Sequence, residues 1–352
     1  MGPGLPFVGP RCGFTVGRTL DAGDVVRRVD AADGAAWVVG SRYRAAVGLP
    51  LVLRRDVDGW SEVAVPLDTE TVTAGLHDVV ALPSGGVWTV GSLRAAEPLA
   101  YRWDGTEFHA VATPDLGVEA EWLGVGGDDR VGVWAVGKRT DGARYRTLVG
   151  RAEGDRFVVV PSPNEGDGNN VLADADAAGD VVWAVGWSYG ADARFHPLAM
   201  RLASDAWELV AIPAPDGDAF LTTVVAGADG TAWAVGWRTI GEEGARALVL
   251  RFDGASWTTV ASPSTAWARL LGADAVDGRL LVVGEGRDDG RRISPVAWFT
   301  DDAGAIWRPA PLDGDGTRWF TDVDLAAAEA AVAVGASSRG IQRSTGFLAT
   351  GC

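Results

Sequence analysis

The chain has 352 residues, of which 47% are hydrophobic and 22% are charged, a composition typical of a globular protein with a large core. Its 47 acidic and 31 basic residues give a formal net charge of -16, which argues against nucleic acid or anionic lipid as the main partner, because both attract cationic surfaces. No run of 18 apolar residues occurs, and two cysteines and three histidines argue against a four-thiolate zinc site or an imidazole-based metal site.

One short pattern recurs along the whole chain. It reads Trp-Ala-Val-Gly or a close variant, and it returns every 46 to 51 residues. Five copies keep the tryptophan and two later copies are degenerate. The closing glycines are Gly40, Gly91, Gly137, Gly186, Gly236, Gly284 and Gly335. A steady period near 50 residues indicates a repeat architecture.

Each period contains four strand-like segments, as the fifth unit shows. Residues 220–226 form an apolar run without helical spacing, and an Asp-Gly turn leads into 231–236. A polar loop separates this pair from 247–252 and 257–261, which a second Asp-Gly turn joins. Four antiparallel strands per unit, repeated radially, predict an all-β, seven-bladed β-propeller that occupies 1–352 as a single domain. A linear β-solenoid or a pair of β-sandwiches is the alternative.

The two chain ends predict how the ring closes. The last unit, 319–352, has three strands and lacks the fourth, whereas the N-terminus begins with an extra strand at 12–18. We therefore expect the N-terminal segment to supply the outer strand of the last blade. Alignment of both ends with the complete units places Cys12 near Cys352, so a disulfide between them is expected, and two free thiols are the alternative.

The repeated strand, the turn that comes later in the unit and the outer strand resemble a known family. The turn reads Arg102-Trp103-Asp104-Gly105 in the second unit, and 300–307 matches the Asp-box pattern S/T-x-D-x-G-x-x-W. The chain thereby resembles the bacterial Trp-Ala-Val-Gly repeat propellers, which are similar in style to kelch-like and Asp-box propellers. The resemblance covers nearly the whole chain and implies the propeller fold. It implies no single activity, because Asp boxes occur in hydrolases and in binding proteins alike.

The connections between strands predict which end of the ring binds ligands. First-to-second and third-to-fourth connections are tight turns, whereas second-to-third and fourth-to-first connections are mostly longer and irregular. In an up-and-down blade the two longer classes lie at the same end. Function concentrates on loops held by a rigid scaffold, so we expect the binding site at this end. Its arginines and acidic residues either orient a ligand or pair with one another.

Tryptophan placement points to the same end. Eleven of the 16 tryptophans fall on blade strands and are expected in the core, whereas five fall in or beside the long loops. Those five either line a pocket or cap the core against water. For His196, a solvated loop position is the alternative to a binding role. The predicted ligand-binding set is Trp122, Trp187, Trp237, Trp319, Phe220, Tyr189, His196 and Arg269.

The innermost strand of each blade brings one residue toward the central channel. By alignment these residues are Arg28, Asp78, Gly124, Asp174, Thr223, Gly272 and Asp322. Carboxylates that lie close together have raised pKa values, and a histidine beside a carboxylate can move protons. Acid–base chemistry is therefore one interpretation of the channel, and a water-filled channel solvated by polar groups is the other. The predicted catalytic set is Asp78, Asp322, Asp174, His77 and Arg28.

No cofactor and no metal site are predicted. The acidic segment 313–317 resembles the start of a calcium loop, but Arg318 stands where such a loop needs glycine and Asp324 where it needs glutamate. An ordinary acidic turn fits this segment better. The chain also lacks a Gly-x-Ser-x-Gly elbow, a phosphate loop and a dinucleotide fingerprint, which argues against oxidoreductase and nucleotidyl chemistry.

These features predict a small-molecule-binding propeller with one asymmetric site at the loop-rich mouth, because the long loops differ between blades. If the site is catalytic, a metal-free acid–base cyclase, lyase or hydrolase is expected. The alternative is a non-catalytic, lectin-like module for protein or carbohydrate. We expect a monomer that binds neither nucleic acid nor membrane. Residues 1–11 do not resemble a signal peptide, and the sequence leaves two locations open: extracytoplasmic if the terminal disulfide forms and a leader was removed, and cytoplasmic otherwise.

Overall fold

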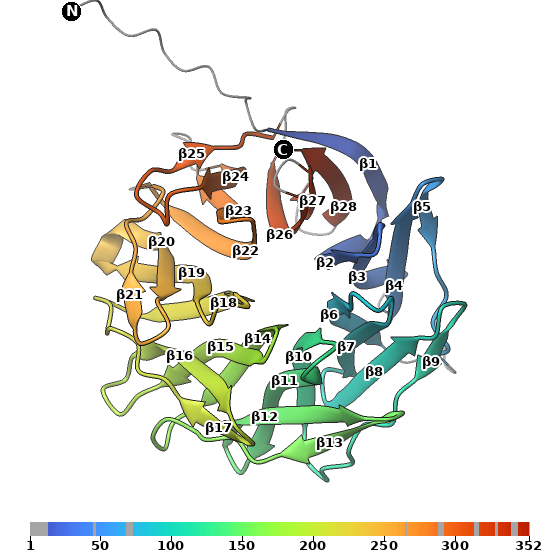
Figure 1. The fold of residues 1–352 in the computed structure, drawn as a ribbon, viewed down its shortest axis with the longest axis horizontal. Coiled ribbons are helices and arrows are strands. Elements are labelled where there is room, and N and C mark those ends of the chain that lie inside the picture. Colours follow the sequence, from blue (N-terminus) through green and yellow to red (C-terminus); the bar gives the residue numbers. More distant parts are fainter. Residues whose placement is uncertain are drawn as a thin grey trace, which may run out of the picture.

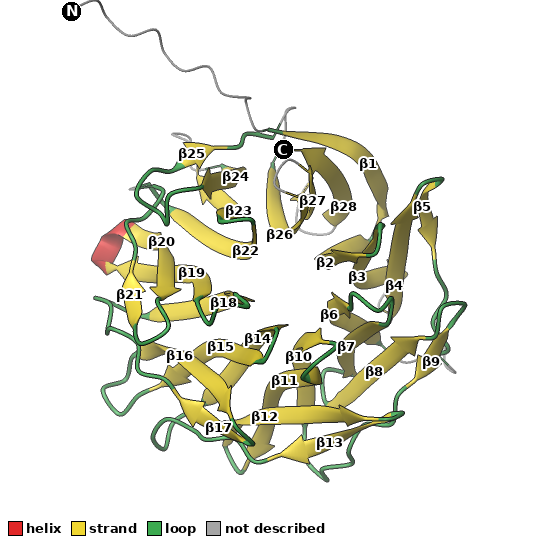
Figure 2. Cartoon of the chain, viewed as in Figure 1, coloured by secondary structure: helices red, strands yellow, loops and turns green. Residues whose placement is uncertain are grey.

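The chain folds into seven four-stranded antiparallel sheets arranged radially around a central axis (Figure 1). The predicted all-β, seven-bladed propeller is confirmed. Helix is limited, in the residues described, to one 3-10 turn, η1 (Gly241–Glu243) (Figure 2). No helix of this part of the chain is long and apolar enough to cross a membrane. The computed structural model describes residues 13–44, 47–67, 73–264, 266–287, 292–312, 317–327, 330–338 and 344–351.

We number the blades one to seven in chain order, and within each blade the strands run from the axis outward. Blades one and two are β2 (Asp24–Ala32), β3 (Ala35–Arg44), β4 (Val47–Asp56) and β5 (Gly59–Glu62), then β6 (Ala74–Ala81), β7 (Val87–Leu93), β8 (Glu97–Trp103) and β9 (Phe108–Ala110). Blades three and four are β10 (Ala120–Asp128), β11 (Gly132–Asp141), β12 (Arg144–Glu153) and β13 (Arg156–Val160), then β14 (Asn170–Ala178), β15 (Val181–Tyr189), β16 (Phe195–Ala203) and β17 (Ala206–Leu209). Blades five and six are β18 (Ala219–Ala226), β19 (Ala232–Ile240), β20 (Gly244–Phe252) and β21 (Trp257–Thr259), then β22 (Ala268–Val276), β23 (Arg279–Arg287), β24 (Ile293–Thr300) and β25 (Arg308–Pro309). Blade seven is β26 (Arg318–Ala327), β27 (Ala330–Ser338), β28 (Ser344–Gly351) and β1 (Phe14–Ala22).

The outer strand of blade seven comes from the other end of the chain. β1 pairs antiparallel with β28, beginning with Phe14 opposite Gly351. The Phe14 ring is fully buried between blades six and seven, 5.2 Å from the ring of Phe320. Head and tail are thereby joined in one sheet, which closes the ring. Cys12 and Cys352 lie outside the described residues, so the disulfide between them stays a prediction.

Apolar side chains between neighbouring sheets hold the blades together. The buried core of the described residues falls into seven clusters, one at each interface between successive blades. Between blades one and two, for example, the Trp37 ring lies 5.0 Å from Trp103 and meets Phe108 edge-on at 5.7 Å. Because each apolar face is buried by the next blade, the strands carry apolar residues on both faces.

A β-bulge recurs at the same place in every innermost strand and decides which side chains face the axis. In all seven strands the pairing with the second strand skips one residue, as it does at His77 between Leu76 and Asp78. The glycine that closes the repeated motif lies opposite this bulge. A Cβ atom at Gly91 would lie 1.9 Å from the carbonyl oxygen of Gly75, so no larger residue fits. Because a bulge breaks the alternation of the strand, His77 and Asp78 both face the channel although they are consecutive.

The segment with Asp-box spacing forms the turn between β24 and β25 at the outer edge of blade six. The Asp302 carboxylate accepts hydrogen bonds from the Thr300 hydroxyl at 2.6 Å and from the Ile306 amide at 2.9 Å. Gly304 takes a φ of 86°, which a side chain would strain. These bonds stay within the turn, so this motif stabilises an edge of the scaffold and contributes nothing to the channel.

Candidate functional site

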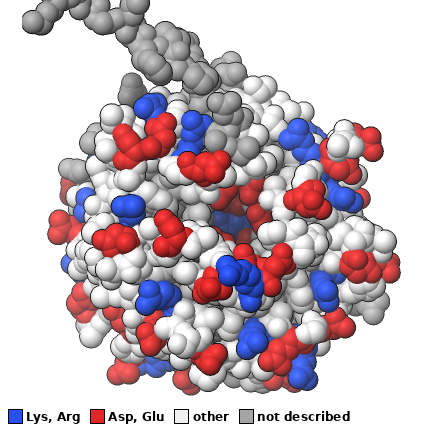
Figure 3. Space-filling model, in the orientation of Figure 1, with Lys and Arg blue, Asp and Glu red and all other residues white. Residues whose placement is uncertain are grey.

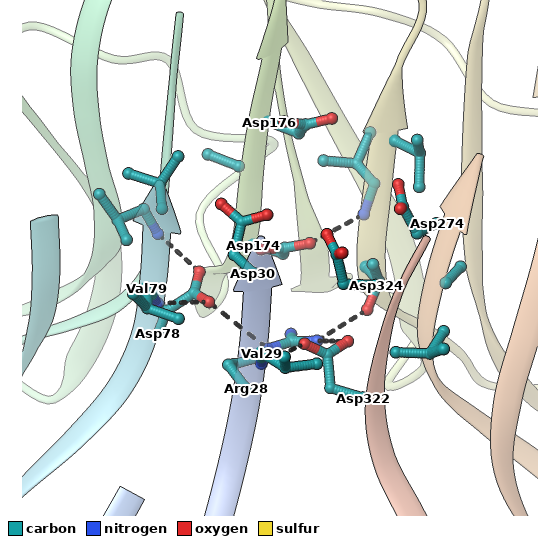
Figure 4. A pocket seen from close by; sticks show the side chains of 18 residues that line it. Arg28, Val29, Asp30, Asp78, Val79, Asp174, Asp176, Asp274, Asp322 and Asp324 are labelled. Carbon is teal, nitrogen blue, oxygen red and sulfur yellow. Dashed lines mark hydrogen bonds and ion pairs between the residues drawn. The ribbon is translucent and has the colours of Figure 1, made fainter. Parts of the chain in front are cut away.

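Two cavities follow one another along the central axis. The larger, which we call the cup, has a volume of about 560 Å³ and lies at the end where the long loops connect to the innermost strands. Its wall includes the bulged residue of every blade. These residues are Arg27, His77, Leu123, Ala173, Thr222, Leu271 and Thr321. The smaller cavity, which we call the acidic chamber, has a volume of about 90 Å³ and lies one to three residues further along the same strands (Figure 4).

Acidic side chains dominate the chamber. Its described wall carries seven aspartates and one basic residue, Arg28. The aspartates are Asp30, Asp78, Asp174, Asp176, Asp274, Asp322 and Asp324. In the space-filling view, the hollow at the centre of the ring is red around a blue patch (Figure 3). Charges of one sign that are removed from water need compensation by partners or by protons.

The guanidinium of Arg28 spans the channel and separates the two cavities. From blade one, its Nη1 donates hydrogen bonds to Thr223 Oγ1 at 3.1 Å and to the Leu271 carbonyl at 3.2 Å. Its Nη2 donates to the Thr222 carbonyl at 2.9 Å, and Nη1 also lies 3.3 Å from an oxygen of Asp322. Because Arg28 lines both cavities, it forms the floor of the cup and one end of the acidic chamber.

Six of the chamber aspartates also bind the backbone of the next blade. Asp78 accepts a hydrogen bond from the amide of Val125 at 2.7 Å, and Asp30 accepts one from Ala81 at 2.6 Å. The other four pairs are Asp174 with Val224, Asp176 with Ala226, Asp274 with Leu325, and Asp322 with Val29. These bonds join successive blades beside the axis, so the carboxylates hold the ring together.

Burial raises the pKa of the chamber carboxyls. It raises the pKa of Asp322 and of Asp176 to about 7 and that of Asp274 to about 8. For Asp78, burial together with the charge of Asp174 holds the pKa well above its ordinary range. At neutral pH the chamber therefore retains part of its protons. In the described part of the chain, no group of three or more His, Cys, Asp or Glu side chains is arranged to hold a metal ion.

The cup offers different chemistry, centred on His77. Its Nδ1 lies 2.8 Å from the Trp122 carbonyl oxygen, which accepts a hydrogen bond, so Nδ1 carries the hydrogen and Nε2 keeps its lone pair. Burial and the neighbouring charge of Arg27 lower the pKa of His77 to about 4. The imidazole is therefore neutral at physiological pH and can accept a hydrogen bond or a proton at Nε2.

Two charged groups flank this histidine. Arg27 is exposed and forms no ion pair with any residue that the structure describes. Glu121 is 14% exposed and pairs with Lys138 at 3.3 Å. The wall beyond is apolar where Ala173 and Leu271 line it. The cup is thus asymmetric, with its charged groups on blades one to three and apolar contacts from blades four and six.

The structure separates the members of the predicted catalytic set. Asp78, Asp174 and Asp322 converge with Arg28 in the acidic chamber. His77 lies in the cup, on the other side of the guanidinium. His77 and these carboxylates therefore line different cavities, because the bulge directs consecutive residues to different places, and a catalytic role of the set stays a prediction.

Trp122 does not line a ligand pocket, contrary to expectation. Its side chain is fully buried between blades two and three, 5.8 Å from the ring of Phe157. The bulge in β10 explains the difference, because it turns Leu123 toward the cup and Trp122 into the core. The backbone carbonyl of Trp122 still contributes, since it fixes the tautomer of His77.

Four other predicted aromatic residues belong to one cluster over blades four and five, which we call the aromatic rim. Phe220 lies at its centre, stacked on Trp237 at 5.1 Å and 6.1 Å from Trp187. Phe195 lies 4.8 Å from Phe220 and 4.9 Å from the ring of Tyr189. All five rings are half-buried, so part of each faces solvent.

The remaining predicted ligand-binding residues lie at separate places. Arg269 extends the rim into blade six, since its guanidinium lies 5.2 Å from the Trp237 ring centre. Trp319 is half-buried at the start of β26 in blade seven. His196 has its Nε2 2.9 Å from Asp192 in the loop between β15 and β16. The structure therefore brings Arg269 to the rim and leaves the other two outside it.

Sequence reasoning did not single out five charged residues of the two cavities as site residues. The spacing Asp-x-Asp at 174–176 and 322–324 is the signal for the deeper chamber carboxyls, because residues two apart share a face of a strand. No comparable sequence signal marks Arg27 and Glu121 as cup residues, because the position of the bulge decides which side chains line the cup. The five residues are Asp30, Asp176, Asp274, Arg27 and Glu121.

Comparison with known proteins supports the fold. No family model and no curated protein matches the chain. An ulvan lyase from a new family of polysaccharide lyases is 12% identical with a TM-score of 0.59, over 97% of this chain and 95% of that one. YCF48 bound to D1 peptide is 12% identical with a TM-score of 0.57, over 98% of each chain. Trypanosoma rangeli sialidase in complex with sialic acid is 12% identical with a TM-score of 0.53, over 99% of this chain but 59% of that one. At such identities the likeness shows the propeller fold alone.

Proposed function

We propose that this protein binds a small ligand that carries a carboxylate next to a hydroxyl group, and that it does so in the cup. The observation that carries the proposal is the placement of Arg27, which has no ion-pair partner among the described residues, beside the neutral imidazole of His77. A carboxylate suits the free guanidinium as a charge-assisted partner. A neighbouring hydroxyl suits Nε2 of His77, which can accept its hydrogen bond.

An acidic sugar fits these requirements best. The cup volume of about 560 Å³ falls within the range of small-molecule sites. The aromatic rim begins at Phe220, two residues before Thr222 of the cup wall, and offers flat apolar surfaces to a sugar ring. Two proteins of similar fold, a polysaccharide lyase and a sialidase in complex with sialic acid, support carbohydrate as the ligand class.

If turnover occurs, we infer an acid–base elimination or hydrolysis without a cofactor. His77 supplies the base at Nε2, and the proton that it accepts stays on the imidazole until it is returned to a leaving group or to water. Arg27 stabilises negative charge on the ligand carboxylate. Glu121, which pairs with Lys138 at 3.3 Å, orients the ligand.

The second candidate is a lectin-like module that binds the same class of ligand without turnover. The observation that favours it is the half-buried aromatic rim, which serves binding and needs no catalytic group. Membership of the Trp-Ala-Val-Gly repeat propellers is likewise proposed, on the five copies of the motif that keep the tryptophan.

A binding screen with a matched pair of variants tests the proposal. Acidic monosaccharides such as glucuronate and sialic acid are compared with glucose and galactose by calorimetry. We expect the acidic sugars to bind and Arg27→Ala to weaken them at least tenfold, about 1.4 kcal/mol or more. Arg156→Ala, which removes an exposed arginine from outer strand β13, is the control and keeps full affinity.

His77→Gln separates the two candidates. In an enzyme, this variant loses turnover of an acidic oligosaccharide while ligand binding falls by less than about tenfold. In a lectin-like module, neither wild type nor variant releases product. Equal affinity for acidic and neutral sugars, together with an unaffected Arg27→Ala variant, contradicts the whole proposal.

A further inference from the structure

A surface of stacked arginines and tryptophans begins beside the cup and runs outward over blades five and six (Figure 1). Arg269 lies two residues before Leu271 of the cup wall, and its guanidinium carbon lies 5.2 Å from the ring centre of Trp237 and 5.3 Å from that of Trp267. Arg287, the last residue of β23, lies over the Trp267 ring at 4.1 Å. We call these four residues the shelf. It starts about 7 Å along the strand from the cup wall, so a ligand longer than one sugar ring reaches both.

The scaffold does not require the indole of Trp267. This residue lies four positions before the bulge of β22, and the corresponding residues of the other six blades are all small or polar. They are Gly23, Thr73, Glu119, Asn169, Asp218 and Thr317. In blade six the indole is half-buried and rests against blade five, since a Cβ atom at Gly244 would lie 3.0 Å from its Cδ1. A large aromatic ring that the fold does not need and that stays partly exposed suits a role in binding.

The arginines of the shelf present hydrogen-bond donors to solvent. Arg287 is exposed and has no ion-pair partner among the residues that the structure describes. Stacking uses the flat face of a guanidinium and leaves the N–H groups at its edge free, and these suit a carboxylate. Arg269 has one ion pair, to Glu285 at 3.4 Å, and its side chain remains 42% exposed. The shelf therefore offers a place for a second carboxylate, outside the cup and next to flat apolar surface.

We propose that the ligand of the cup is the terminal unit of an acidic oligosaccharide, whose following units lie on the shelf with a second carboxylate bound by Arg287. This inference rests on the proposed function of the cup and extends it from a single sugar to a chain. Because Arg28 closes the floor of the cup, a chain enters it by one end only. The apolar faces of the following sugar rings pack on the indoles, and Arg27 and Arg287 bind carboxylates of different units.

The charge of the whole protein favours a narrow chain over a large acidic partner. The formal net charge of -16 repels an acidic protein surface wherever that surface extends past the shelf. A single oligosaccharide chain contacts little beyond the cup and the shelf, so it gains the attraction of the arginines without this repulsion. An acidic peptide is the nearest competing ligand, and the test below includes one.

The test compares acidic sugars of different length by calorimetry at constant ionic strength. The probes are the monomers and trimers of galacturonate, mannuronate and guluronate. For the sugar that binds best, we expect the trimer to bind at least about tenfold more tightly than the monomer, because its second contact is intramolecular. Arg287→Ala should leave the monomer unchanged and bring the trimer to within about threefold of it.

Arg151→Ala is the matched control. Arg151 is also exposed and lies over a tryptophan ring, that of Trp134, at 5.9 Å, but it lies beside the tight turn between β12 and β13. This variant should keep the full preference for the trimer. Both arginines are exposed, so neither variant should change the thermal unfolding midpoint by more than about one degree. Arg27→Ala should weaken monomer and trimer alike, since both place a carboxylate in the cup.

The possible failures of the two proposals are distinct. If the monomer binds through Arg27 but the trimer gains nothing, or gains as much in Arg287→Ala as in wild type, the chain inference is overturned while the function of the cup stands. If no acidic sugar of this test or of the earlier screen binds, the function of the cup fails and the inference fails with it. If hexaglutamate binds in a manner that needs Arg287 while the trimers gain nothing, the shelf is a docking surface for protein, and the inference is overturned.

Discussion

The cup and the acidic chamber are built by the same seven strands, yet they differ in almost every property. The cup is lined by bulged residues of mixed character, among them the exposed Arg27 and the neutral His77. The chamber is lined by carboxyls that bind the backbone of the next blade. A single bulge assigns neighbours in sequence to these different roles, as at Arg27 and Arg28 or at His77 and Asp78. Residues next to each other in such a strand therefore have separate functions, one for ligands and one for the scaffold.

The adjacent residues Arg27 and Arg28 test this difference between the two cavities with the largest expected effect. Arg28→Met removes the one basic side chain of the described chamber wall and leaves several buried carboxyls uncompensated. We expect it to lower the free energy of unfolding by about 3–5 kcal/mol at pH 8, the cost typical of a broken buried ion pair. Arg27→Met makes the same chemical change at an exposed position and should alter stability by less than about 0.5 kcal/mol. Urea denaturation of both variants measures the difference.

The loss in Arg28→Met should also depend on pH. Near pH 5.5 the chamber carboxyls take up protons, so the missing cation matters less and the cost should fall by about half or more. Equal stability of the two variants at both pH values would show that Arg28 does not compensate the chamber. The position of its guanidinium between the cup and the acidic chamber would then contribute nothing measurable to the free energy of unfolding.

The seven-bladed ring could be predicted because the residues that specify each blade lie close together in the sequence and recur in every unit. The closing glycines recur at a constant spacing, and Asp-Gly turns mark the hairpins, so blade number and strand order follow from the sequence. The structural requirement for glycine at these positions, however, cannot be read from the neighbouring sequence. Gly91 is required because the bulged partner strand brings the Gly75 carbonyl within 1.9 Å of the position of a Cβ atom, and this contact forms only after the strands pair.

The site could be predicted only in part for the same reason. The aspartates at 78, 174 and 322 were identified from alignment as residues facing the axis, and they do face it. Their separation from His77 could not be predicted, because a one-residue bulge is invisible in a pattern of period two. Trp122 shows the same limit, since its place before the bulge puts it in the core rather than the cup. Period and composition thus indicate the strand, and pairing decides the face.

The free energy of unfolding should also depend on pH through the chamber carboxyls, and this effect is smaller than the loss expected for Arg28→Met. Folding raises the pKa of Asp176 and Asp322 to about 7 and of Asp274 to about 8, from an ordinary value of 3.8. Between about pH 4 and pH 8 the folded chain therefore binds more protons than the unfolded chain, so stability falls as pH rises through this window. The lowered pKa of His77 acts in the opposite direction below about pH 6.5, but it is one group against several.

We therefore expect the thermal midpoint to be several degrees higher near pH 5.5 than near pH 8.5. Asp274→Asn should reduce this difference, because it removes the carboxyl whose pKa is raised to about 8. Glu208→Gln, at the surface, should leave the difference unchanged. A midpoint that rises with pH in the wild-type protein would mean that the chamber carboxyls are ionised at little cost, contrary to their burial.

The smallest expected effect belongs to the cup, where the binding of an acidic ligand should hardly depend on pH. His77 has a pKa of about 4, so the cup gains no charge between about pH 8 and pH 5.5, and affinity should change by less than about threefold. A histidine with an ordinary pKa near 6.5 would become cationic in this range and strengthen the binding of a carboxylate markedly.

Calorimetry at both pH values, with an NMR titration in which His77→Gln identifies the imidazole signal, separates the two cases. Arg27→Met adds a second test, because it removes one of the three causes of the low pKa, which are burial and the charges of Arg27 and Lys138, and should move the titration of His77 upward. A wild-type His77 that titrates near 6.5 would lie in water rather than in the cup wall, and the neutral base that distinguishes this cavity from the chamber would not exist.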